Sequence, residues 1–68
     1  MTQWQTLKAG DVRPGQKIRT QDGMELTATR IERPFMGIDS MLAFIEDTPE
    51  RWFKRPAPVD GDVEVLTA

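Results

Sequence analysis

Two turn signals divide the first half of this 68-residue chain into short extended segments. Pro14-Gly15 precedes residues 17–20, and Asp22-Gly23 separates these from residues 24–31; both segments alternate polar and apolar side chains. An Asp-Gly pair between two alternating segments supplies the positive φ angles that a tight β-hairpin requires. We therefore predict a hairpin between residues 12 and 33, with the remaining chain packed around it.

The second segment of this hairpin changes phase. Met24, Leu26 and Ala28 share one face of a regular strand, whereas Ile31 falls on the opposite face. A β-bulge near Thr29-Arg30, or strong coiling of the strand, would turn both faces inward in succession. Small closed barrels need such a bend.

Three further stretches predict strands. Residues 3–8 and 63–66 are short extended segments, and residues 41–45 form a nearly continuous apolar run that indicates a central strand with both faces covered. Five or six short strands with tight turns are typical of a barrel, which removes exposed sheet edges. We predict an all-β fold, a small SH3-like barrel of antiparallel strands, as a single domain over residues 1–68. The expected core, with one tryptophan or part of both, is Val12, Ile18, Leu26, Ala28, Ile31, Leu42, Phe44, Phe53, Val63 and Val65.

The stretch Asp47-Thr48-Pro49-Glu50 allows two interpretations. Proline at the second position of a four-residue turn predicts a hairpin into residues 52–54, which is the alternative we favour. In the other interpretation, Thr48 caps a short helical turn that has Pro49 at its first position. Farther along, proline sterics extend residues 56–58 and exclude them from the interior of a sheet.

Composition excludes several kinds of site. The chain has no Cys and no His, so it lacks zinc-thiolate and redox chemistry, the commonest metal ligand and the usual general base. Ser40 has no histidine to activate it, and the adjacent Glu46 and Asp47 point to opposite faces of a strand. We expect no catalytic residues, no metal, no cofactor and no enzymatic activity.

The longest apolar run, residues 41–45, is far shorter than the ~20 residues that a membrane span requires. No basic segment followed by an apolar core marks a secretion signal near the N-terminus. We therefore expect a cytoplasmic protein without a membrane partner. The formal net charge of -2 argues mildly against nucleic-acid binding.

Residues 51–55, Arg-Trp-Phe-Lys-Arg, form the most suggestive functional stretch. Basic residues between aromatics can neutralise phosphates while the rings stack on bases. The same pattern is expected of a half-buried strand whose aromatics fill the core, and we favour this interpretation. Adjacent aromatics face opposite ways on a strand, so we expect Phe53 inside and Trp52 exposed as an interface anchor. The predicted binding residues in this stretch are Arg51, Trp52, Lys54 and Arg55.

A second basic set lies in the predicted hairpin. Lys17 and Arg19 share one face of its first strand, and we expect Arg30 across from them on the partner strand. Such a row can bind phosphates, and it can equally serve as solubilising charge that discourages edge pairing. We favour solubilising charge and keep these three residues as candidate nucleic-acid contacts.

Turn glycines and alternating apolar residues follow one another in the order Pro14-Gly15, Ile18, Asp22-Gly23, Leu26, Ala28 and Ile31. This order is similar to the opening of SH3-like barrels, and it resembles the layout of KOW-type translation domains and of the first domain of elongation factor P. The basic, glycine-rich loop that RNA-binding members use is not evident in this chain, so their function does not carry over. The chain as a whole is also similar to small uncharacterised bacterial or phage proteins.

These patterns favour a non-enzymatic interaction module that binds a protein partner through an exposed aromatic and basic rim. We place Phe35 and Met36 beside Trp52 on that rim. The alternative is a nucleic-acid-binding barrel that uses Lys17, Arg19, Arg30 and the 51–55 stretch. A homodimer is a variant of the first hypothesis, because a short open sheet edge can pair with a second copy.

Overall fold

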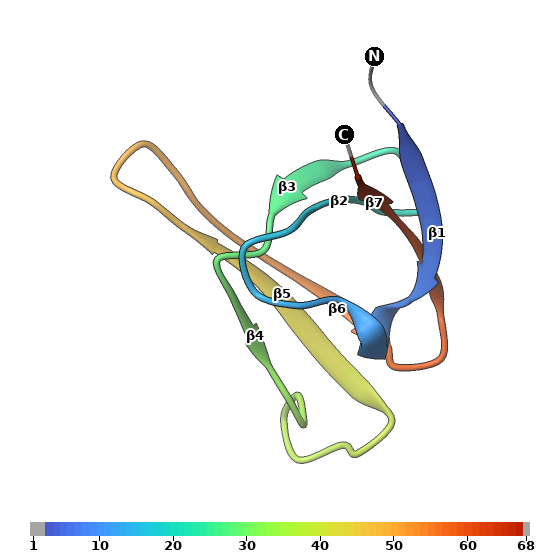
Figure 1. Ribbon diagram of the computed structural model, residues 1–68. Coiled ribbons are helices and arrows are strands. Elements are labelled where there is room, and N and C mark those ends of the chain that lie inside the picture. The colour runs from blue at the N-terminus through green and yellow to red at the C-terminus, as the bar shows by residue number, and fades with distance from the viewer. Residues whose placement is uncertain (1–2, 68) are drawn as a thin grey trace.

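The computed structural model describes residues 3–67 of the chain, which form seven strands and one short 3-10 turn (Figure 1). The elements are β1 (Trp4–Lys8), η1 (Ala9–Asp11), β2 (Lys17–Arg19), β3 (Glu25–Thr27), β4 (Arg30–Glu32), β5 (Met41–Asp47), β6 (Trp52–Pro58) and β7 (Asp62–Leu66). No helix within residues 3–67 is long and apolar enough to cross a membrane.

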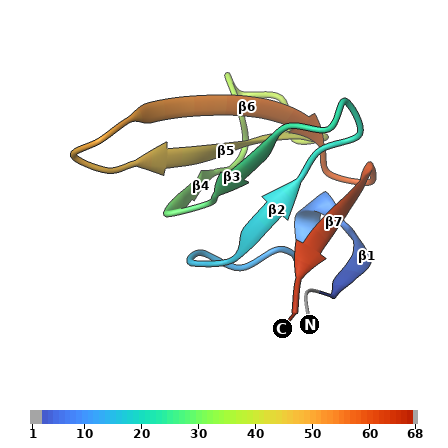
Figure 2. The same cartoon turned by 90° about the horizontal axis from the view of Figure 1, so that it is seen from above.

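The strands form two antiparallel sheets. One has the order β1-β7-β2-β3 and the other has the order β4-β5-β6 (Figures 1 and 2). The all-β prediction is confirmed, with seven strands between residues 3 and 67 where we expected five or six. The two sheets do not close into a barrel by hydrogen bonding, which fits a loose SH3-like arrangement.

The predicted first hairpin is present between β2 and β3. Thr20 N donates to Met24 O at 2.8 Å, and Gly23 N donates to Thr20 O at 2.9 Å. Gly23 takes the positive φ of 87°, whereas Asp22 does not enter that region. The loop therefore has three residues and a left-handed glycine at its end, a common hairpin connection.

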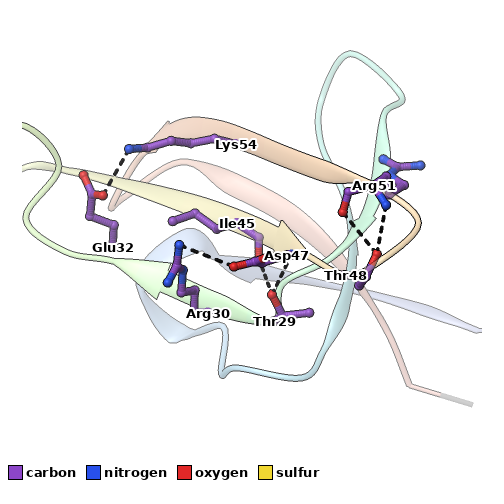
Figure 3. A network of polar contacts seen from close by, with 8 residues as sticks. All are labelled: Thr29, Arg30, Glu32, Ile45, Asp47, Thr48, Arg51 and Lys54. Atoms are coloured by element: carbon purple, nitrogen blue, oxygen red, sulfur yellow. Dashed lines mark hydrogen bonds and ion pairs between the residues drawn. The ribbon is translucent and has the colours of Figure 1, made fainter.

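The prediction of one strand over residues 24–31 is wrong. The chain leaves the first sheet after β3 and enters the second sheet at β4. Thr29 lies at this change of sheet, where its hydroxyl Oγ1 donates to Ile45 O at 3.0 Å and accepts from Asp47 N at 2.9 Å (Figure 3). A side chain thus replaces the backbone ladder at the junction, and the change of phase marks a change of sheet.

The core lies between the two sheets. Eight of the ten predicted core residues are buried there, whereas Ile31 and Phe53 are only partly covered. Ala9 and Ala57 complete this cluster, and both tryptophans lie outside it. The eight confirmed residues are Val12, Ile18, Leu26, Ala28, Leu42, Phe44, Val63 and Val65.

The hairpin interpretation of residues 47–51 is confirmed. Thr48 N donates to Arg51 O at 3.0 Å, and the Thr48 hydroxyl accepts from Arg51 N at 3.2 Å (Figure 3). The β5–β6 hairpin that this turn closes extends past the rest of the molecule in both ribbon views (Figures 1 and 2). As proline sterics require, residues 56–58 lie in β6, which is an edge strand.

Candidate protein-interaction surface

The register between β5 and β6 assigns the side chains of both strands to two faces. Leu42 and Phe44 belong to the buried core, and their partners across the sheet are Ala57 and Arg55, so these residues share the inner face. The alternate residues of β5 and β6 therefore lie on the outer face. This outer set contains Ala43, Ile45 and Asp47 from β5, and Trp52, Lys54, Pro56 and Pro58 from β6.

The two adjacent aromatics of β6 point in opposite directions, as the alternation predicts. Phe53 lies on the inner face and is half-buried. Trp52 lies on the outer face, pairs with Asp47 across the sheet and keeps 58% of its surface exposed. An indole this exposed on a protruding hairpin is free to contact another macromolecule.

The basic residues near Trp52 are each held by a carboxylate. Arg51 Nε lies 2.7 Å from Glu46 Oε2, and its guanidinium stands 5.4 Å from the centre of the Phe53 ring. Lys54 Nζ lies 3.0 Å from Glu32 Oε1 (Figure 3). Arg55 forms an ion pair with Asp22 in the β2–β3 turn. The structure thus places Arg51 and Arg55 on the inner side of the hairpin and Lys54 on the outer face with Trp52.

The second basic set does not form one row. Lys17 and Arg19 share the outer face of the first sheet, but Arg30 lies in the other sheet, opposite Ile45 of β5. The expectation that Arg30 faces Lys17 and Arg19 is therefore wrong, because the chain changes sheets at Thr29. Each member also has an acidic neighbour: Lys17–Glu25 at 3.6 Å, Arg19–Glu64 at 2.9 Å and Arg30–Asp47 at 3.6 Å.

The loop between β4 and β5 exposes the apolar side chains of Met36 and Ile38 far from Trp52. Ile38 N donates to Phe35 O at 2.9 Å, closing a turn in which Met36 and Gly37 have φ values of 51° and 75°. Met36 is 79% exposed at the tip of this turn. The loop and the β5–β6 turn lie at opposite ends of the β4-β5-β6 sheet (Figure 1). Met36 therefore does not share a rim with Trp52.

The hydrogen-bond pattern shows which backbone groups of β6 point away from β5. Val59 N donates to Ser40 O and Thr48 N donates to Arg51 O, so the pairs 40–59 and 48–51 are hydrogen-bonded. Bonded and non-bonded pairs alternate along an antiparallel ladder. The register therefore turns the N–H and C=O groups of residues 52, 54, 56 and 58 outward.

Two of these four outward positions carry no N–H, because residues 56 and 58 are prolines. Trp52 and Lys54 retain theirs, and no hydrogen bond within residues 3–67 satisfies either group. We refer to residues 52–54 with these outward backbone groups as the Trp52 edge. It combines an exposed indole with unpaired strand hydrogen-bonding groups, and the spacing of the two prolines was the sequence signal that could have located it.

A shallow groove of about 250 Å³ lies where the two sheets fail to close. Arg55–Pro58 of β6, Thr20–Asp22 of the β2–β3 turn and Gly61–Val63 line it. Several of its polar groups bond to each other: Gln21 Nε2 donates to the backbone carbonyl of Asp62 at 3.3 Å, and the Thr20 hydroxyl donates to the Asp22 carboxylate. Within residues 3–67 no buried side-chain polar atom lacks a partner, so no buried polar group points to a ligand in this groove.

Two carboxyl groups, those of Glu64 and Asp22, have contacts that lower their pKa. A hydrogen bond from Arg19 lowers the pKa of Glu64, and a hydrogen bond from Thr20 with the charge of Arg55 lowers the pKa of Asp22. A carboxyl with a lower pKa in the folded state stabilises that state above its ordinary pKa and loses this effect as pH falls. We expect the midpoint temperature of thermal unfolding to decrease as the pH is lowered below about 5. Glu64→Gln should make this decrease in midpoint temperature smaller. A midpoint that is independent of pH between 3 and 7 would contradict this assignment.

No protein-family model, curated protein or solved structure matches this chain. Within residues 3–67 no group of three metal-ligating side chains comes together. What the geometry defines is a small all-β domain of two antiparallel sheets with one exposed aromatic edge.

Proposed function

We propose that this chain is a non-enzymatic interaction module that binds a protein partner at the Trp52 edge. The observation that carries the proposal is a 58% exposed tryptophan beside unpaired strand N–H groups on a protruding hairpin. Tryptophan is enriched among the residues that dominate binding energy at protein interfaces. Unpaired strand groups add a second means of attachment, because a partner strand can extend the sheet. A cytoplasmic location and a distant kinship with SH3-like barrels belong to the same proposal.

A protein partner has more support than nucleic acid. Phosphate binding requires basic side chains that are free to replace counterions. All six basic candidates already contact carboxylates: Lys17, Arg19, Arg30, Arg51, Lys54 and Arg55. The formal net charge of -2 adds no attraction for a polyanion.

Trp52→Ala tests the proposal. We expect affinity for the partner to fall at least about tenfold, since truncating an interface anchor costs about 2 kcal/mol or more. The fold should persist, because the exposed Trp52 side chain lies outside the core cluster. The measurement is capture of a defined protein by the tagged chain, with and without nuclease, followed by titration of the purified partner against both variants.

Met36→Ser is the matched control, because it removes an exposed apolar side chain at the opposite end of the sheet. We expect it to leave binding unchanged. A Trp52→Ala chain that binds as well as the parent would overturn the proposal. Capture that disappears with nuclease, together with steep salt dependence of oligonucleotide binding, would favour the nucleic-acid alternative.

A further inference from the structure

The Trp52 edge has a defined length. On one side Pro56 and Pro58 remove the outward N–H groups, so a pairing strand finds only carbonyl acceptors there. On the other side the turn at residues 48–51 ends the strand. The remaining edge offers two N–H donors and two C=O acceptors, at Trp52 and Lys54.

The two halves of the outward edge of β6 differ in how they are protected. Edge strands commonly carry prolines, charged side chains or bulges that prevent pairing with another chain. The two prolines protect the C-terminal half of β6 in this manner. The N-terminal half instead presents an exposed tryptophan, and its lysine is held by Glu32 at 3.0 Å. The N-terminal half of β6 is therefore the part of this edge that stays open to strand pairing.

We propose that the Trp52 edge pairs with the same edge of a second copy of this chain, antiparallel, across a two-fold axis at Phe53. This inference names the partner of the surface in the proposed function. The two-fold axis brings Trp52 opposite Lys54 of the partner subunit, and Lys54 opposite the partner's Trp52. Residues that face each other in a hydrogen-bonded antiparallel pair exchange both N–H···O bonds. Every outward N–H of the edge is thereby satisfied, and a continuous sheet β4-β5-β6 is doubled in width.

The side chains complement one another in this register. Trp52 and Lys54 both lie on the outer face, so each indole stands directly across from a lysine of the other copy. The Lys54 ammonium is directed across β5, 3.0 Å from Glu32 Oε1 of β4 and 5.0 Å from the centre of the Phe35 ring, so its aliphatic stem is the part that the partner's indole meets. On the inner face, Phe53 meets the partner's Phe53 at the axis, and facing aromatics stabilise a sheet.

The charges at this interface permit the pairing. The same register sets Arg51 opposite the partner's Arg55 on the inner face, a contact between like charges that destabilises a sheet when uncompensated. Here Arg51 is paired with Glu46 at 2.7 Å and Arg55 is paired with Asp22. A two-residue slip in either direction loses bonds, because Pro56 or the turn would then face the edge. The prolines and the turn thus select one register.

Concentration-dependent amide exchange tests the pairing on the unmodified chain. We expect a monomer–dimer equilibrium in sedimentation between about 10 µM and 1 mM, the affinity range of small interfaces. Exchange at the Trp52 and Lys54 amides should slow as the dimer forms. The Phe53 amide is an internal control, because its N–H already points to Glu46 of β5 in the hydrogen-bonded pair.

Lys54→Pro removes one outward N–H and no backbone hydrogen bond of the monomer, since it extends the pattern of Pro56 and Pro58. Lys54→Ala is its matched control: both variants lose the Glu32 ion pair, but alanine keeps the N–H. We expect Lys54→Pro to weaken dimerisation at least tenfold more than Lys54→Ala, which corresponds to about 1.4 kcal/mol.

Two results would overturn the inference: a chain that stays monomeric up to about 1 mM, or a dimer in which the Trp52 and Lys54 amides exchange at unchanged rates. Neither result tests the proposed function. Capture of a different protein through Trp52 would still support that function. Conversely, a dimer paired through this edge in a chain that captures no other protein would establish the second copy as the partner.

Discussion

Phe44→Ala is expected to lower the free energy of unfolding by about 3–5 kcal/mol, the largest loss among the substitutions proposed for this domain. Phe44 is the largest fully buried side chain, and it stands at the centre of β5 between Ile31 and Arg55 of the neighbouring strands. Replacing a buried Phe by Ala removes its transfer free energy and leaves a cavity, a loss of about 3–5 kcal/mol. A domain of 68 residues has a free energy of unfolding of roughly 3–10 kcal/mol, so this loss is a large fraction of it.

Urea denaturation followed by circular dichroism measures the effect. Phe44→Leu is the control, because leucine refills much of the volume and should lose markedly less stability. In both variants the slope of the unfolding free energy against urea concentration should equal that of the parent chain, because this slope reports the surface exposed on unfolding. A Phe44→Ala variant that is less than about 1 kcal/mol weaker than the parent would show that Phe44 does not lie in a close-packed core.

Glu46→Ala is expected to lower the free energy of unfolding by about 2–3 kcal/mol. Glu46 is only 8% exposed, accepts a hydrogen bond from Thr27 N at 2.6 Å and pairs with Arg51 at 2.7 Å. It therefore ties β5 of one sheet to β3 of the other, across the seam where no strand ladder connects them. Its removal leaves the Thr27 N–H without this acceptor, and such a buried donor is costly.

Two neighbouring substitutions separate this role from simple loss of charge. Glu46→Gln keeps an oxygen acceptor for Thr27 and should lose less stability than Glu46→Ala in the same denaturation experiment. Asp47→Ala removes an exposed carboxylate 3.6 Å from Arg30 and should change stability by less than about 0.5 kcal/mol. Equal losses for Glu46→Ala and Asp47→Ala would refute the seam-bridging role of Glu46.

The candidate site was predicted in part. Alternation along β6 was enough to separate Trp52 from Phe53, because neighbouring side chains of a strand always face opposite ways. It could not show that Arg51 and Arg55 reach Glu46 and Asp22, because these carboxylates come from a different strand and from a turn 33 residues away. The prediction that Phe35 and Met36 lie beside Trp52 was wrong for a similar reason. Nothing in the local sequence pattern determines at which end of a sheet a loop lies.

Local chemistry determined much of the chain by itself. Gly23 and Gly15 took the positive φ angles that their turns require, the proline turn at residues 48–51 closed a hairpin, and apolar alternation identified most of the core. Only the tertiary structure decided that residues 24–31 divide between two sheets at Thr29, and that Glu46 is buried as a bridge between them. The reason is physical: turns and alternation depend on neighbouring residues, whereas the choice of sheet depends on hydrogen-bond partners that lie far apart in the chain.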